Sequence, residues 1–91
     1  MIPTDSKNHI KANDIIYALI NRNIVTLHDH CIIRHLDTGP VAHHITLLFD
    51  YAHNEYIVRG DMYKSEEFKE YRTSFADVAE ERFNYLVDLW S

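Results

Sequence analysis

The chain has 91 residues but only one cysteine, two glycines and two prolines, and it has no long hydrophobic run. The lone cysteine, Cys31, excludes an internal disulfide and suits a reducing compartment. Two glycines make it hard to build the glycine-rich loops that cradle phosphates. The longest apolar run, residues 15–20, is far shorter than the ~20 residues that span a bilayer, and the N-terminus lacks the pattern of a signal peptide. We therefore expect a cytoplasmic protein.

Negative charge is distributed unevenly along the chain. The formal net charge is −5, and residues 1–45 are neutral because four Asp are balanced by four Lys or Arg. Residues 46–91 carry ten carboxylates against five cationic side chains, so the whole net charge belongs to this half. Such an asymmetry favours a basic partner protein and opposes direct binding to nucleic acid or to an anionic membrane.

The length and a hydrophobic fraction of 46% predict a single domain over residues 1–91. Hydrophobic periodicity predicts the α+β class, as a three-stranded antiparallel β-meander with an N-terminal helix and C-terminal helices (α-β-β-β-α). The expected elements are a helix over 12–22, strands over 24–33, 41–51 and 56–63, a short helix from Ser65, and a last helix over 75–90. The helices should cover one sheet face, which leaves the other face to solvent or to a second copy of the chain.

The last predicted helix is amphipathic. Ser74 is its expected N-cap. Its apolar stripe is predicted to contain Phe75, Ala79, Phe83, Leu86 and Trp90. The opposite side carries Asp77, Glu80, Glu81 and Asp88. Most acidic helix faces are simply solvated, but this one could also dock a basic protein.

Seven histidines raise the question of a metal site. If the hairpin turn centres near residues 38–39, His30 lies opposite Leu47 and His43 lies opposite Arg34. The pairs His28/His30 and His43/His44 are then out of register by about 13 Å, whereas ligands must converge at about 2 Å from the metal. We expect no metal and no cofactor, with surface or half-buried histidines as the main interpretation and a metal site or a pH-sensing role as alternatives.

No motif of a nucleophilic enzyme is present, and Cys31 is expected to be a small buried apolar residue. We therefore predict that the protein is not an enzyme. A small histidine-metal hydrolase is the least favoured alternative, since the other metal ligands that such an enzyme needs are absent from the neighbourhood of His28-Asp29-His30.

The small size, acidic second half, element order and Lys/Glu/Asn/Ile/Tyr-rich usage resemble the DNA-mimic anti-restriction proteins of T-even phages. The resemblance implies a protein that acts in the host cytoplasm and inhibits a modification-dependent restriction nuclease or binds a nucleoid protein. It also implies that exposed carboxylates imitate DNA phosphates. The residues that match this role are Glu66, Glu67, Glu70, Asp77, Glu80, Glu81 and Asp88.

Two further expectations concern partners. An alternative to charge mimicry is a protein-protein interaction module that is anchored by aromatic side chains, such as an antitoxin-like or polymerase-binding regulator. A homodimer is also expected, because the uncovered sheet face and eleven aromatic residues leave surface for a second copy.

Overall fold

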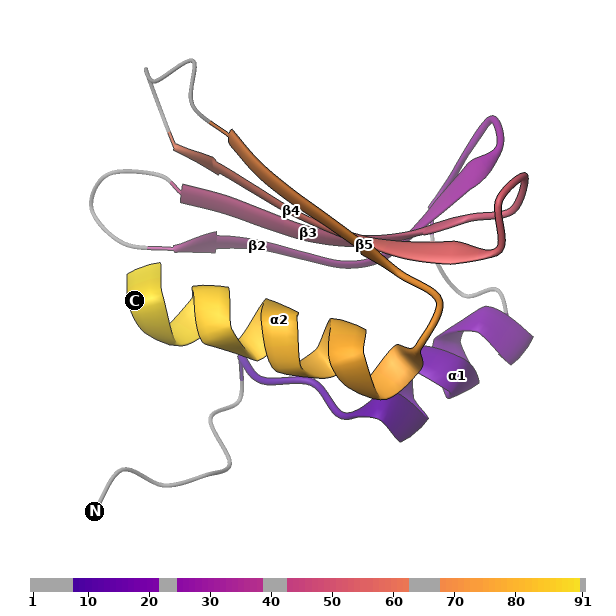
Figure 1. Cartoon of the computed structure of the whole chain (residues 1–91), viewed down its shortest axis with the longest axis horizontal. Coiled ribbons are helices and arrows are strands. Elements are labelled where there is room, and N and C mark those ends of the chain that lie inside the picture. The colour runs from indigo at the N-terminus through magenta and orange to yellow at the C-terminus, as the bar shows by residue number, and fades with distance from the viewer. Residues whose placement is uncertain (1–7, 22–24, 39–42, 63–67, 91) are drawn as a thin grey trace.

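The protein is a two-layer α+β structure, in which two helices cover one face of an antiparallel sheet (Figure 1). The computed structural model describes residues 8–21, 25–38, 43–62 and 68–90. The elements are α1 (Ala12–Asn21), β1 (Thr26–Leu27), β2 (His30–Thr38), β3 (His43–Asp50), β4 (Glu55–Met62), β5 (Phe68–Thr73) and α2 (Ala76–Trp90). The predicted class, with an antiparallel sheet between an N-terminal and a C-terminal helix, is confirmed.

The sheet has five strands in the order β1-β2-β3-β4-β5, so the prediction of three strands was wrong. The strand expected over 24–33 is divided by a turn, in which His28 adopts a positive φ of 47° that no strand tolerates. The start of the short helix expected from Ser65 lies outside the described residues, and residues 68–73 form strand β5 along β4. Tyr71 and Thr73 are of the aromatic and β-branched types that favour strands. In residues 68–73, pairing with β4 therefore outweighs the helix N-cap signal of Ser65 in the sequence.

The register of the β2–β3 hairpin also differs from the prediction. Thr38 pairs with His43 and His30 pairs with Asp50, because the connection lies at residues 39–42 and β2 has a bulge between Ile32 and Arg34. A bulge places one extra residue on one strand and therefore shifts every pairing beyond it.

The core lies between α2 and the covered face of the sheet. Phe83, Leu86 and Ala79 of α2 are fully buried against Ile45 and Leu47 of β3 and their neighbours. Deleting a side chain as large as Phe83 typically costs about 3–5 kcal/mol of stability. Cys31 is buried, as predicted.

Gly60 on β4 lets the end of α2 approach the sheet closely. A Cβ at this position would lie 2.5 Å from the Trp90 ring, so any larger residue would displace the ring.

The predicted apolar stripe of the last helix is present from Ala79 to Trp90. Phe75 was wrongly assigned to this stripe, because it precedes the helix and is 66% exposed.

Phe75 also replaces Ser74 as the N-cap of α2. The Ala79 N–H donates to the Phe75 carbonyl at 3.0 Å, which makes Phe75 the residue that precedes the first helical one. The Phe75 N–H in turn donates to the Thr73 hydroxyl at 3.2 Å. The segment between β5 and α2 is thus held by Thr73 and not by the predicted serine cap.

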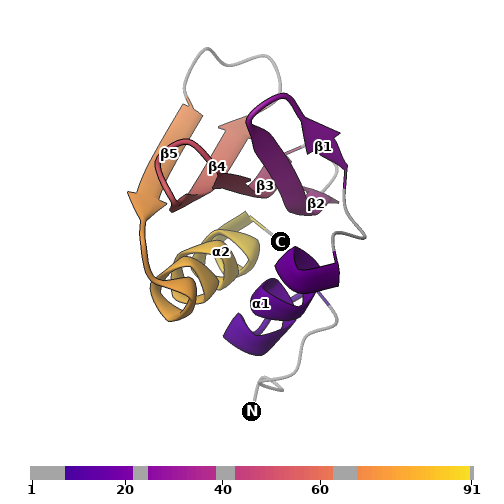
Figure 2. The ribbon, with the colours of Figure 1, turned by 90° about the vertical axis from the view of Figure 1, so that its right-hand side faces the viewer.

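Helix α1 agrees with the predicted helix over 12–22 and lies beside α2 (Figure 2). Asp14 accepts from the Lys11 N–H at its start, and the Asn21 amide donates to the Tyr17 carbonyl at its end. Ile15 is buried, but Ile20 is 75% exposed, because α1 contacts the rest of the molecule along one side only. Among the described residues, neither helix is long and apolar enough to cross a membrane.

Candidate functional site

The acidic side of α2 forms as predicted and is called here the acidic stripe: Asp77, Glu80, Glu81 and Asp88. Asp77, Glu81 and Asp88 are exposed, and Glu80 is half-buried. Asp77 lies in the first turn of α2, where the helix dipole favours a negative charge. The described part of α2 contains one cationic residue, Arg82. The stripe is therefore the most acidic helical surface in the described chain.

One end of the acidic stripe is tied to the N-terminal segment. His9 Nε2 lies 2.6 Å from Asp88 Oδ1, which makes a short hydrogen bond and, when the imidazole is protonated, an ion pair. Beside it, Asn84 accepts from the Ile10 N–H at 3.0 Å and donates to the Ile10 carbonyl at 2.9 Å. Asp88 thus has a cationic partner when His9 is charged.

The structure does not bring all seven predicted carboxylates together. Glu66 and Glu67 lie outside the described residues. Glu70 is on strand β5 and not on a helix, and its carboxylate lies 3.2 Å from Arg72 Nε on the uncovered face of the sheet. The prediction of a short helix at Glu70 was therefore wrong, because the chain forms strand β5 there.

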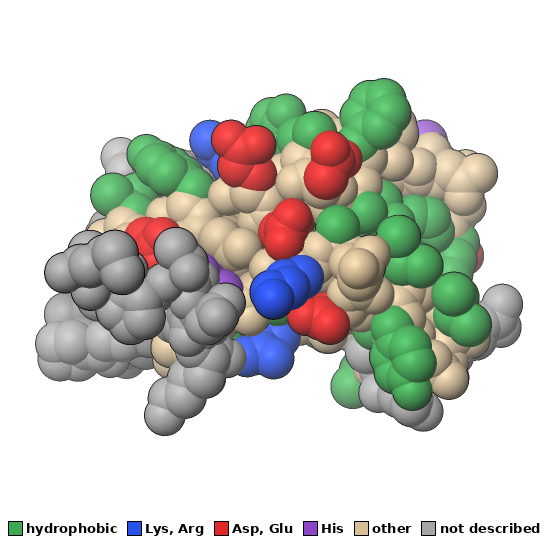
Figure 3. Space-filling model, turned by 90° about the horizontal axis from the view of Figure 1, so that it is seen from below, with side chains coloured by type: hydrophobic (Ala, Val, Ile, Leu, Met, Phe, Trp, Pro, Cys, Tyr) green, Lys and Arg blue, Asp and Glu red, His purple; other side chains and the backbone are tan. Residues whose placement is uncertain are grey.

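The helix side of the molecule carries acidic groups in separate spots, with hydrophobic and basic side chains between them (Figure 3). B-DNA presents one charge per ~1.7 Å of its axis, which is denser than one helix with four carboxylates. The helix side is therefore chemically mixed, and α2 carries charge more sparsely than a DNA backbone.

Aromatic side chains flank the acidic stripe on the β5 side and are called here the aromatic flank: Tyr71, Phe75 and Tyr85. All three are exposed. The Arg82 guanidinium lies 5.2 Å from the Tyr71 ring centroid and 5.4 Å from that of Tyr85, within cation–π distance of both. Tyr71, Arg82 and Tyr85 line a shallow hollow of about 300 Å³ together with Val78 and Glu81.

The uncovered face of the sheet holds two clusters in which one aspartate contacts two histidines. The first, the Asp50 cluster, lies at the β3–β4 turn. Asp50 is buried and accepts from His53 Nδ1 at 2.8 Å and from Arg72 at 3.2 Å, and His30 Nε2 lies 3.7 Å away. Burial raises the pKa of Asp50, but the hydrogen bonds from His53 and Arg72 outweigh this effect and lower the pKa to about 2.

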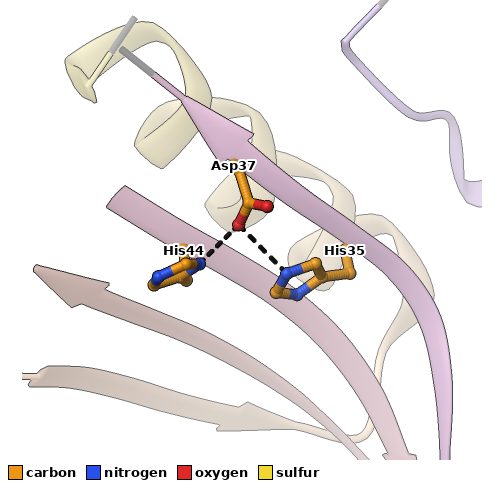
Figure 4. Close-up of side chains that lie close together, drawn as sticks. All are labelled: His35, Asp37 and His44. Carbon is orange, nitrogen blue, oxygen red and sulfur yellow. Dashed lines mark hydrogen bonds and ion pairs between the residues drawn. The ribbon is translucent and has the colours of Figure 1, made fainter. Parts of the chain in front are cut away.

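The second, the Asp37 cluster, lies at the other end of the β2–β3 hairpin (Figure 4). Asp37 Oδ1 accepts from His44 Nδ1 and, at 3.2 Å, from His35 Nε2. The hydrogen bond from His44 is the largest of the effects that lower the pKa of Asp37. His35 Nδ1 lies 2.9 Å from the Thr46 hydroxyl, which orients its ring.

Sequence reasoning missed the Asp37 cluster. Its signal was present, because His35 and Asp37 are two residues apart on one strand and therefore share a face. Placing His44 beside them required the correct register, in which Asp37 pairs directly with His44. The predicted register would have placed Asp37 opposite residue 40.

The histidine pairs that the sequence did single out do not converge. His43 faces the core side, where its ring stacks on Trp90 with centroids 4.8 Å apart, and His44 faces the opposite side of the sheet. His28 lies in the β1–β2 turn, and His30 pairs with Asp50, seven residues along β3 from His43. The pairs therefore do not converge, as expected, but they are seven residues apart along β3 and not the predicted four, because the predicted register was wrong.

Comparison of the chain with models of known protein families, with curated proteins and with solved structures finds no match.

Proposed function

We propose that this protein is a non-catalytic inhibitor that acts in the cytoplasm and docks a basic, DNA-binding partner protein through the acidic stripe. The partner class is a restriction nuclease or a nucleoid protein whose DNA-binding surface is occupied by the stripe. The observation that carries the proposal is the row of exposed carboxylates at Asp77, Glu81 and Asp88 on one side of α2, with Arg82 turned toward the tyrosines.

The aromatic flank supports a second candidate, an interaction module in which aromatic anchors contribute most of the binding free energy. Tyr and Trp side chains dominate interface hot spots, and Tyr85 is exposed next to the stripe and beside a hollow. In this candidate the carboxylates select a basic partner and accelerate the encounter, while Tyr71, Phe75 and Tyr85 hold it.

The partner should be captured from host lysate on the immobilised protein and identified by mass spectrometry. Recovery of mainly DNA-binding proteins would support the proposal, and the identified partner then allows affinity to be measured. Charge mimicry predicts an affinity that falls steeply with salt, because exposed charges are screened. An aromatic-anchored contact predicts weak salt dependence and a large loss in Tyr85→Ser.

Charge reversal provides the residue-level test. Glu81→Lys should weaken partner binding by about tenfold or more, because it changes an attractive charge into a repulsive one at the centre of the stripe. Asp29→Lys, at an exposed position in the β1–β2 turn, makes the same change in net charge far from α2 and should leave binding nearly unchanged. Equal losses in the two variants would show that only net charge matters, and no loss in either would remove the stripe as the interface.

We also propose a homodimer. The uncovered sheet face is rich in charged side chains in its described part, whereas α1 exposes Ile16, Tyr17 and Ile20. The apolar side of α1 is therefore the surface that a second copy should cover. Sedimentation at micromolar concentration should give twice the 10.8 kDa chain mass, and Ile20→Lys should give a monomer.

A further inference from the structure

We propose that His35, Asp37 and His44 form a binding site for one divalent transition-metal ion, of which Zn²⁺ is the representative. One ligand atom from each residue is available, and the three atoms all lie within 4.8 Å of one another. The site is independent of the acidic stripe, since it lies on the opposite, uncovered side of the sheet. It departs from the sequence-based expectation of no metal.

The metal-free geometry is close to that of a coordinated ion. Two ligands at ~2.0–2.2 Å from Zn²⁺ are separated by about 3.3 Å in a tetrahedral site. His35 Nε2 and Asp37 Oδ1 already lie 3.2 Å apart. The His44 contact with Asp37 is shorter and must lengthen, which a small rotation of an accessible ring permits. The ion would take the place of the N–H protons that now lie between the rings and the carboxylate.

The β2–β3 ladder sets the backbone positions of the three ligands. Asp37 pairs with His44 and His35 pairs with Thr46 in antiparallel register, so all three side chains lie on one face of the sheet. The rings of His35 and His44 are stacked with centroids 5.8 Å apart. When His35 binds a metal through Nε2, its proton resides on Nδ1, which then donates to the Thr46 hydroxyl. Such an outer-shell partner is typical of metal-bound histidine.

The surrounding charges also favour a cation. The ion pairs of Asp37 within the described residues are those with His35 and His44, and the connecting residues 39–42 carry no charged side chain. Asp61, which lies opposite His44 across β3–β4, is ion-paired with Arg59 at 3.2 Å, so these two nearby charges largely cancel.

The donor set selects the type of ion. Two imidazoles and one carboxylate suit Zn²⁺ and its neighbours among the transition metals, whereas Ca²⁺ and Mg²⁺ require mainly oxygen ligands. All three side chains are partly exposed, so the remaining coordination positions are open to water. The arrangement therefore matches an open site and not a closed structural one.

The test is calorimetric titration of the untagged protein with zinc chloride in a non-coordinating buffer. One Zn²⁺ per chain is expected, and His35→Gln, His44→Gln and Asp37→Asn should each weaken binding by about 100-fold, since even outer-shell changes cost 10–100-fold. The matched control is His53→Gln, which removes a histidine from the Asp50 cluster and should change the affinity less than about twofold. Circular dichroism verifies that each variant is folded.

Imidazole ¹⁵N spectra give a second readout that does not depend on affinity. Zinc should shift the Nε2 signal of His35 and the Nδ1 signal of His44, and it should leave His30 and His53 in place. Binding that survives in His35→Gln and His44→Gln would overturn the proposal, as would shifts confined to other histidines. A stoichiometry of one ion per two chains would also overturn it, because the ion would then bridge two molecules.

Discussion

The two ends of the β2–β3 hairpin carry the same residue types in different environments. At each end one aspartate contacts two histidines: Asp37 with His35 and His44, and Asp50 with His30 and His53. The Asp50 side chain is 4% exposed and also pairs with Arg72, whereas the Asp37 side chain is 62% exposed. The backbone N–H groups of Ala52 and His53 donate to Asp50 as well.

Because burial and the contact with Arg72 differ, we infer different roles for the two clusters. Asp50 has its acceptor positions filled by backbone, imidazole and guanidinium donors, so it stabilises the turn between β3 and β4. A guanidinium beside a carboxylate also repels a metal ion. Among the described residues, the ion pairs of Asp37 are with His35 and His44, which can themselves become metal ligands. We therefore infer a structural role for the Asp50 cluster, which Arg72 completes, and a ligand-binding role for the Asp37 cluster.

The largest expected effect is the loss of the buried carboxylate. Asp50→Asn should lower the melting temperature by about 10 °C, because it replaces a buried carboxylate oxygen by an amide donor that faces the donors of His53 and Arg72. Asp37→Asn at the exposed end should change it by about 2 °C or less. Thermal unfolding followed by circular dichroism measures both. Equal losses in the two variants would show that Asp50 and Asp37 contribute equally to stability, against the difference in role inferred here.

Acid should lower the stability that Asp50 contributes to the fold over a defined pH range. The pKa of Asp50 is about 2 in the folded protein and about 3.9 in an unfolded chain. Because the folded value is the lower one, the contribution of Asp50 to stability is complete above pH ~4 and is lost as the pH falls toward 2. Urea midpoints between pH 5 and 2 should fall more steeply for the wild type than for Asp50→Asn. Parallel curves would show that Asp50 does not contribute.

A smaller effect is expected when the arginine alone is removed. Arg72→Gln should raise the pKa of Asp50, since the hydrogen bond from Arg72 is one of the causes that lower it. The stability loss should be less than that of Asp50→Asn, because His53 and two backbone N–H groups still donate to the carboxylate. Carbon-13 NMR titration of the Asp50 carboxyl measures the shift. An unchanged pKa would mean that Arg72 does not complete the cluster.

The smallest effect concerns the support of His35. Thr46→Val keeps the shape of the side chain but removes the hydroxyl that orients the ring. Zinc affinity should fall by about tenfold, the lower end for an outer-shell partner, while the melting temperature changes little. Thr26→Val, at an exposed position of β1, is the matched control and should leave zinc affinity unchanged. A drop of equal size in the control would contradict the role given to Thr46.

The sequence predicted the parts of the fold that depend on local pattern. The 3.6-residue period located α1 and α2, and alternation with turn residues located β3 and β4. Strand β5 was missed because Ser65 and its acidic neighbours resemble a helix start, and cross-strand pairing is not visible in a local window. Phe75 was misplaced because an extrapolated stripe does not show where a helix begins.

The same contrast between local pattern and strand pairing explains which candidate site the sequence predicted. The acidic stripe is a property of one helix, so periodicity was enough to find it. The Asp37 cluster depends on which residues of β2 and β3 lie opposite each other, and the predicted pairing was displaced by about four residues. The bulge near Ile33 and the length of the connection set that register, and neither has a strong local signature.

The most direct test of the contrast between the two clusters is a crystal structure of the zinc-loaded protein with anomalous diffraction at the zinc edge. We predict one peak at about 2.0–2.2 Å from His35 Nε2, His44 Nδ1 and an Asp37 oxygen, with Asp50 still bound to Arg72 and His53 as in the metal-free protein. A peak at the Asp50 cluster, or no peak at Asp37 in crystals that contain stoichiometric zinc, would contradict the account.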